Sequence, residues 1–255
     1  MTVKQVLLFA IGCLPLAVAA QMPGVLPLAS EPHHHLALHN EYVNVYQVEV
    51  APHDSVLLHR HDFDAISVML SDSQVTVHIP GKPDVQQKLS DGQVRLQARG
   101  YVHSTSIEGV TTYRNVTVEL LQPQKEPRNL CASVMAAQPM NCLAEQSSPP
   151  SSTHTEQPQF ETAQTYVTLT RVLPRQNMAL GEAARSELIV PLDAASIATA
   201  GETGSGNPLL PGDFKWVAKG QTEAVLKNNG DKEVRLILFR LKPQGAVETT
   251  PAPTK

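Results

Sequence analysis

The strongest constraint on the fold is a series of short segments that are rich in β-branched and aliphatic residues. In the first half they read "EYVNVYQVEV", "SVLLHRHDFDAISVML", "SQVTVHIPG", "GQVRLQARG" and "TTYRNVTVELLQP", separated by Gly, Pro, Asp or Ser. Several such segments without a helical pattern predict the strands of a sandwich or barrel. Val43 and Val45 are out of phase with Val48 and Val50, which predicts a β-bulge at Tyr46-Gln47.

The second half of the chain repeats this organisation. Gly212 and Gly220 lie 120 residues after Gly92 and Gly100, and Pro174 lies 122 residues after Pro52. The stretch between the halves, "LAEQSSPPSSTHTEQPQFETA", is low in aliphatic residues and cannot bury enough surface to offset its chain entropy. We therefore expect an all-β chain with two small β-barrel or jelly-roll domains in tandem.

The N-terminus has the pattern of an export signal. Lys4 precedes an apolar run from Val6 to Ala19, and small residues end at Ala20. Cys13 within this run leaves a lipoprotein signal open as an alternative, and no later segment has the ~20 apolar residues that a membrane-spanning helix needs. We expect an exported protein, periplasmic or secreted. Its expected regions are a signal peptide (1–20), an irregular segment (21–39), a first barrel (40–125), a linker (126–163), a second barrel (164–243) and a disordered tail (244–255).

Charge and cysteine content narrow the partners and the compartment. The net charge is −4 and no block of Lys or Arg occurs, which excludes nucleic acid as a main partner because phosphate binding needs a basic surface. Removal of the signal would leave Cys131 and Cys142. An even pair in an oxidising compartment predicts one disulfide in the linker, with two free thiols as the alternative.

Three histidines are candidate metal ligands. His59 and His61 are one residue apart in a segment with strand character, so their side chains point to the same face. Two imidazoles so placed can reach one divalent ion at about 2 Å, and Zn, Fe, Mn and Ni all accept imidazole to different degrees. His103 follows a Gly-bounded turn in "ARGYVHS", and Tyr101 shares its strand parity and could line the same pocket. The alternative is a pair of polar residues on a strand.

With these residues the chain resembles the cupin superfamily. Cupins are small β-barrels whose first motif carries H-x-H and then Glu, and whose second motif reads G-x5-P-x-G-x2-H-x3-N. The resemblance implies that His59, His61 and His103 share one divalent metal inside the first barrel. It also implies a metal-binding glutamate at Ala65 or Ile66, and neither residue can coordinate. Asp64 is close, but strand alternation turns it away from the histidine face unless a bulge intervenes.

The missing carboxylate affects the expected chemistry. Three histidines are a known ligand set for zinc. The set lacks the carboxylate of the 2-His-1-carboxylate iron oxygenases, which makes oxygenase chemistry less favoured.

The second half keeps the β pattern and loses the ligands. Gly181 and Ala183 stand where the first half has His59 and His61, and Glu223 stands where it has His103, so we expect a degenerate barrel. Another cluster, "PHHHLALHN", carries the four histidines His33, His34, His35 and His39 in the segment expected to be irregular. We interpret it as a solvated turn, with a second metal site over the barrel mouth as the alternative.

Two functions fit these residues. The favoured one is an exported bicupin that binds a divalent metal or a small ligand in its first barrel without catalysis. The alternative is a metal-dependent cupin enzyme of isomerase, hydrolase or dioxygenase type that acts on a small polar molecule, with the ion polarising an oxygen or activating water. The sequence identifies no substrate and leaves a homo-oligomer open.

Overall fold

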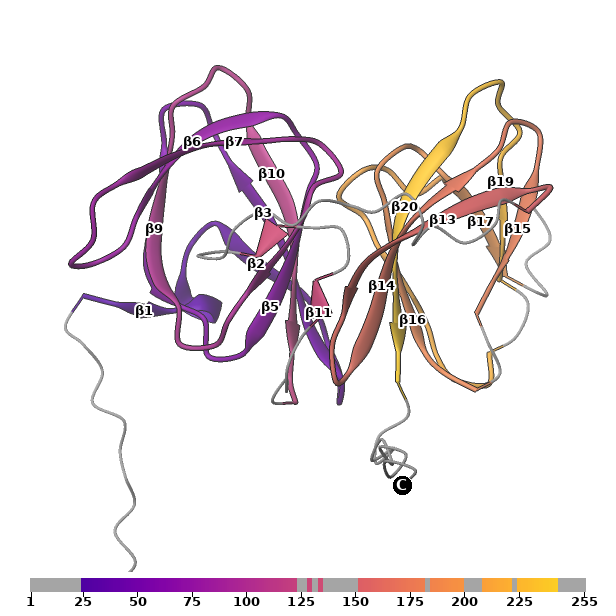
Figure 1. Cartoon of the computed structure of the whole chain (residues 1–255), viewed down its shortest axis with the longest axis horizontal. Coiled ribbons are helices and arrows are strands. Elements are labelled where there is room, and N and C mark those ends of the chain that lie inside the picture. The colour runs from indigo at the N-terminus through magenta and orange to yellow at the C-terminus, as the bar shows by residue number, and fades with distance from the viewer. Residues whose placement is uncertain are drawn as a thin grey trace, which may run out of the picture.

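The computed structural model describes residues 24–122, 128–129, 133–134, 151–181, 184–199, 208–221 and 224–242. In this part of the chain the only helix is the 3-10 turn η1 (Leu28–Ser30), and strands form the rest of the regular structure. Figure 1 shows two β-barrels side by side, the first in indigo to magenta and the second in orange to yellow. The predicted all-β, two-barrel fold is confirmed. Within the described ranges, no helix has the length and apolarity to cross a membrane.

Four sequence predictions lie outside the described residues. These are the signal peptide, the tail, the pairing of Cys131 with Cys142, and the placement of Ala183 and Glu223.

The first barrel is built from two facing sheets. Its elements are β1 (Leu26–Pro27), β2 (His34–His39), β3 (Val43–Val50), β4 (Ser55–Arg60), β5 (Asp64–Met69), β6 (Ser73–His78), β7 (Val85–Leu89), β8 (Val94–Gln97), β9 (Val102–Ile107), β10 (Tyr113–Leu120) and β12 (Ser133–Val134). One sheet has the strand order β1-β4-β9-β6-β7 and the other β12-β8-β5-β10-β3-β2. Only the pairs β1–β4 and β12–β8 are parallel among these neighbours.

The second barrel has the same plan with a smaller facing sheet. Its strands are β11 (Arg128–Asn129), β13 (His154–Glu161), β14 (Thr165–Val172), β15 (Asn177–Leu180), β16 (Glu187–Pro191), β17 (Ser196–Thr199), β18 (Lys215–Val217), β19 (Ala224–Lys227) and β20 (Val234–Leu241). The sheets have the orders β11-β13-β14-β20-β16-β18 and β15-β19-β17. Gly92 and its counterpart Gly212 both have positive φ angles (78° and 104°), as do Gly100 and Gly220 (79° and 81°). Only glycine adopts this conformation without strain, which explains why the repeat keeps these positions.

An apolar layer joins the two barrels. The outward faces of β3, β5 and β10 pack against those of β14, β16 and β20 in one buried cluster, here called the interbarrel core. It includes Val45, Ile66, Val118, Leu188 and Phe239. The inward faces form a separate apolar cluster in each barrel. These central strands are therefore buried on both faces, which gives near-continuous apolar runs in the sequence.

The predicted bulge at Tyr46-Gln47 is wrong. β3 pairs with β10 in unbroken register along its whole length. Val43 and Val45 face the interbarrel core, whereas Val48 and Val50 face the interior of the first barrel, so both faces of the strand are apolar. The register shift lies instead in β2, between Leu36 and Leu38.

Two expected irregular segments contain regular structure. The segment 21–39 was expected to lack it, yet it forms β1, η1 and β2, because β2 completes a sheet edge beside β3 and β1 pairs with β4. The linker was expected to reach residue 163, yet β13 begins at His154 and pairs with β14. In both places the sequence lacks an aliphatic alternation, and the neighbouring strand supplies the backbone partners.

Candidate metal centre

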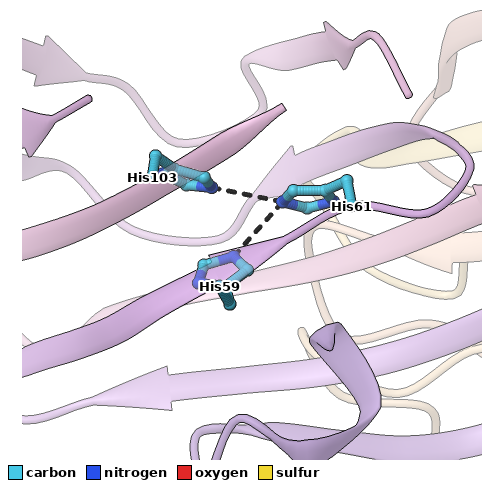
Figure 2. Close-up of side chains that lie close together, drawn as sticks. All are labelled: His59, His61 and His103. Atoms are coloured by element: carbon cyan, nitrogen blue, oxygen red, sulfur yellow. Dashed lines mark hydrogen bonds between the residues drawn. The ribbon is translucent and has the colours of Figure 1, made fainter. Parts of the chain in front are cut away.

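The three predicted ligands converge inside the first barrel. His59 lies near the end of β4 opposite His103 on β9, and His61 follows β4 directly. Figure 2 shows the three rings pointing toward one another from these two segments. The Nε2 atoms of His59 and His61 are 3.3 Å apart, and those of His61 and His103 are 3.1 Å apart. The three side chains are buried, with at most 7% of each residue exposed.

The backbone fixes the loop that carries His61. Its N–H donates to the carbonyl of Tyr101 at 3.0 Å, and its carbonyl accepts the N–H of Gly100 at 2.7 Å. These bonds connect the end of β4 to the turn before β9, so the position of His61 is fixed relative to that of His103.

The spacing of the Nε2 atoms fits a shared ion. Imidazole nitrogens bind zinc at about 2.0–2.1 Å, which places two ligands about 2.8–3.4 Å apart for angles between 90° and tetrahedral. The observed separations of 3.1 and 3.3 Å fall within that interval. His59 Nδ1 donates to the carbonyl of Leu57 at 2.8 Å, so its Nε2 carries the lone pair. A metal-ligating histidine usually makes such a bond with its other nitrogen.

Burial keeps the imidazoles neutral. Desolvation lowers the pKa of His59 to about 4 and lowers the pKa values of His61 and His103 well below their usual range. Neutral imidazole is the form that binds a metal, so no proton has to leave these rings near neutral pH. The donor set therefore fits a divalent ion.

An acid–histidine pair from the N-terminal segment supports His59, and the sequence analysis missed it. Glu31 is only 2% exposed and accepts the Nδ1–H of His34 at 2.6 Å and the N–H of Leu57 at 3.1 Å. The ring of His34 lies 4.9 Å from the ring of His59. Burial alone would raise the pKa of Glu31, but the bonds from His34, Leu57 and His33 lower it. A carboxylate charge thus lies beside the centre.

The interpretation of the N-terminal histidines as solvated is therefore wrong for His34, whose side chain is 6% exposed. His35 and His39 are exposed as expected, but they lie on strand β2 and not in a turn. Nothing in the local pattern distinguishes His34, because the rings that it packs against, Tyr46 and His59, come from β3 and β4.

Tyr101 and Asp64 were the other pocket candidates. The ring of Tyr101 lies 4.6 Å from that of His103, against the histidine group. Asp64 caps the start of β5 by accepting the N–H of Arg99 at 3.0 Å and is not part of that group. The Tyr101 hydroxyl and His61 Nδ1 are buried without a hydrogen-bond partner among the described residues. Such atoms usually mark a missing polar partner such as a water or an ion.

Ala65 stands where the cupin motif has glutamate, and a different carboxylate lies beside it. In the pairing of β5 with β10, Ala65 is opposite Glu119, which is 2% exposed. Glu119 Oε2 accepts the side-chain N–H of Asn44 at 2.8 Å and the hydroxyl of Tyr46 at 3.2 Å. Burial raises the pKa of Glu119. In the sequence, "NVTVE" alternates like a strand with a solvated face, so this residue gives no signal of being internal.

Strand register shows how the second barrel differs. The pair Ala65–Glu119 corresponds to Glu187–Arg240 in the pairing of β16 with β20. Polar inward positions of the first barrel are aliphatic in the second. By the same register, Ser67, Gln97, Asn115 and Thr117 correspond to Ile189, Val217, Leu236 and Leu238. The first interior is therefore polar where the second is filled with aliphatic side chains.

A buried ion pair takes the place of the ligands in the second barrel. Arg240 donates to Glu187 at 3.2 Å and also pairs with Glu156. Glu187 Oε2 accepts the N–H of Gly181, the counterpart of His59, at 2.8 Å. Burial opposes the charge of Arg240, but the bonds to Glu156 and Glu187 raise its pKa. Within the described ranges, the three-histidine group of the first barrel is the one cluster able to hold a metal.

Comparison with known proteins places the fold. No family model matches the chain, and neither does any curated protein. Among solved structures, AerE from Microcystis aeruginosa has a TM-score of 0.56 at 12% identity, over 84% of this chain and 99% of that chain. A cupin 2 conserved barrel domain protein from Leptotrichia buccalis has a TM-score of 0.51 at 9% identity, over 80% and 86%. A variant of Bacillus subtilis oxalate decarboxylase OxdC has a TM-score of 0.53 at 13% identity, over 79% and 69%.

The fold is therefore that of the cupins, as the sequence resemblance implied. In this chain it occurs as two consecutive barrels, and the histidine group of the first barrel fits a metal-binding cupin.

Proposed function

We propose that the first barrel binds one divalent metal ion through His59, His61 and His103 and uses it to capture a small polar molecule. The observation that carries this proposal is the convergence of three buried Nε2 atoms at 3.1 and 3.3 Å. Zinc, iron, manganese and nickel are the candidate ions, since the ligand set does not select among them. Three protein ligands leave coordination positions for an external ligand.

The surroundings of the histidines favour a ligand with oxygen atoms. The unpartnered hydroxyl of Tyr101 and the hydroxyl and amide groups of Ser67, Gln97 and Thr117 give the interior a polar lining. The structurally similar oxalate decarboxylase is named for a small organic acid. Small organic acids are therefore the first class to test.

Binding without catalysis is the favoured role, and a metal-dependent enzyme is the second candidate. When bound, the ion would supply Lewis-acid polarisation of a ligand oxygen. The chain's own contribution is to hold three neutral imidazoles in place: the Leu57 carbonyl accepts the Nδ1–H of His59, and Glu31 accepts the N–H of Leu57. The observation that favours an enzyme is the presence of two buried carboxylates in the first barrel, Glu31 near His59 and Glu119 on the inward face of β10, because such groups can move protons.

The first experiment measures metal. The purified protein should contain close to one equivalent of a divalent metal by elemental analysis, and His59→Ala/His61→Ala should contain almost none. His78→Ala is the matched control, because His78 is an exposed histidine on β6 whose side chain is 53% exposed. Equal, near-zero metal in the wild type and the double variant would overturn the assignment.

The second experiment separates a binder from an enzyme. Metal-loaded protein is mixed with a panel of small organic acids, sugars and diketones, and both thermal stabilisation and turnover, including oxygen uptake, are followed. Stabilisation without turnover supports the binding role, because a ligand that binds only the native state raises its stability. Metal-dependent turnover that is lost in His59→Ala/His61→Ala would establish the enzyme instead.

We also propose that residues 1–20 direct export. Expression of the full chain followed by N-terminal sequencing of the mature product should give a start at Gln21. A product that keeps Met1 in the cytoplasmic fraction would contradict this.

A further inference from the structure

We propose that Glu119 supplies the carboxylate that the metal centre lacks at Ala65, moved by one strand from β5 to β10. This inference rests on the proposed metal site of the first barrel. It assigns a fourth protein group to that site, from a position that the cupin motifs do not include.

The first step is the direction of the two side chains. Ile66 and Val68 face the interbarrel core, and Met69 packs inside the first barrel. Alternation therefore points Ala65 inward, and its direct partner Glu119 points the same way. Ala65 is fully buried, yet its side chain ends at Cβ. At this position the inward face of β5 presents the methyl group of Ala65, and the neighbouring β10 presents the carboxylate of Glu119.

The second barrel shows what side chains at these positions can reach. Glu187 occupies the position of Ala65, and its Oε2 bonds the backbone of Gly181, which occupies the position of His59. Arg240 occupies the position of Glu119, and its guanidinium bonds the other oxygen of Glu187 at 3.2 Å. Side chains from the two neighbouring strands thus meet beside the first ligand position.

The hydrogen bonds of Glu119 suit a ligand. Asn44 and Tyr46 both donate to Oε2, and no described residue is bonded to Oε1. The two donors orient the carboxylate and leave one oxygen for another partner. A ligating carboxylate is usually held in this way by outer hydrogen bonds.

Charge gives the reason why a carboxylate is expected. Three neutral imidazoles bring no charge to a divalent ion, and the nearby Glu31 carboxylate already accepts bonds from His34 and Leu57. Most of the charge of the ion would therefore stay uncompensated in a buried site, where unpaired charge is costly. Glu119 is buried and the two groups that donate to it, from Asn44 and Tyr46, are neutral, so its carboxylate has charge to offer to a cation. Ion and carboxylate would each lower the cost of burying the other.

The test is metal affinity rather than activity. Glu119→Gln keeps the shape of the side chain, and Glu108→Gln is the control because Glu108 is exposed on the same barrel. The dissociation constant for Zn²⁺ is measured by competition with a chelator, and the ligand set is followed by the visible absorption of bound Co²⁺. We expect Glu119→Gln to weaken Zn²⁺ binding by roughly 10–100-fold and to change the Co²⁺ bands, with no effect of Glu108→Gln.

A relocation variant makes the test sharper. Glu119→Ala/Ala65→Glu moves the carboxylate back to the strand that carries it in the cupin motif, and it should recover most of the affinity that Glu119→Gln loses. If Glu119→Gln failed to fold, as judged by circular dichroism, the relocation variant would decide alone, with wild-type affinity supporting the proposal and a ten-fold loss contradicting it. Unchanged affinity and an unchanged Co²⁺ spectrum in Glu119→Gln would overturn the role of Glu119 and leave the three-histidine site standing. A wild type that binds no metal would overturn both.

Discussion

Replacing Arg240 by methionine tests whether the second barrel depends on its internal ion pair. Arg240 bonds Glu187 and Glu156, and the exposed fractions of these three side chains are 13%, 3% and 17%. Methionine keeps most of the apolar stem and removes the charge. Glu187 would then be left as a buried carboxylate whose remaining bond is to the N–H of Gly181.

The magnitude follows from the burial of these groups. Removing one partner of a buried pair costs about 3–5 kcal/mol, because the charge that remains is no longer compensated. Glu187 is almost inaccessible to water, so solvent recovers little of this loss. For a chain of this size each kcal/mol lowers Tm by roughly 2–4 °C, so Arg240→Met should lower it by roughly 6–20 °C.

Urea unfolding followed by circular dichroism measures the free energy of unfolding, and calorimetry measures Tm. Arg99→Met is the control, because Arg99 is exposed in a turn of the first barrel and its loss should change stability by less than about 0.5 kcal/mol. The double variant Arg240→Met/Glu187→Met removes the uncompensated carboxylate as well and should be more stable than Arg240→Met. A loss below about 1 kcal/mol for Arg240→Met would refute the reasoning, since exposed pairs contribute that little.

Three further predictions concern the support of His59, acid stability and the contact between the barrels. Glu31→Gln should weaken Zn²⁺ binding by roughly ten-fold in a chelator competition, because it loosens the groups that orient His59; unchanged affinity would contradict this. In metal-free protein the pKa of His59 is about 4 against an ordinary value of 6.5, so the unfolded chain binds the extra proton and stability falls as pH drops from 6.5 to 4. At 1.36 kcal/mol per pKa unit, His59 alone should lower the free energy of unfolding by about 3 kcal/mol over this pH range. Urea unfolding with a chelator present at pH 7 and pH 4.5 should show most of this loss. Equal free energies of unfolding at the two pH values would refute the lowered pKa of His59. Arg235 forms ion pairs with Asp91 of the first barrel and Asp193 of the second, and about a third of each side chain is exposed. Arg235→Met should therefore lower the free energy of unfolding by no more than about 1 kcal/mol, and by less at high salt. A loss above about 3 kcal/mol would contradict this.

The fold was predictable because strand and turn patterns are local. The glycines at 92, 100, 212 and 220 mark turns that need positive φ, and the segments between them have the composition of strands. The bulge predicted in β3 was wrong because the sequence does not show what packs against the outward face of this strand. A strand is expected to alternate when one face meets water, but the outward face of β3 meets the second barrel, so valines occur on both faces.

The site was predictable only as far as motifs are local. His59, His61 and His103 stand in recognisable contexts, and the structure brings them together. Glu31 and Glu119 have no such context, because each is placed in the interior of the first barrel by a partner far away in the sequence. Glu31 is placed by the backbone of Leu57, and Glu119 by its register with β5. Such contacts depend on which strands become neighbours, and a single sequence does not give that pairing.

The two barrels carry different charges at the equivalent strand pair, which is Ala65–Glu119 in the first barrel and Glu187–Arg240 in the second. In the second barrel, Arg240 supplies a permanent cation that neutralises Glu187, and aliphatic side chains fill the interior around them. In the first barrel the corresponding residue is Glu119, the neighbouring position is alanine, and the inward side chains include histidines, amides and hydroxyls beside the apolar cluster. The first interior holds a buried carboxylate and three neutral imidazoles, and its own buried cation, Arg95, bonds Gln87 and lies near His103. A divalent ion held by the three imidazoles would add coordination positions for an external ligand, which the guanidinium of Arg240 in the second barrel does not offer.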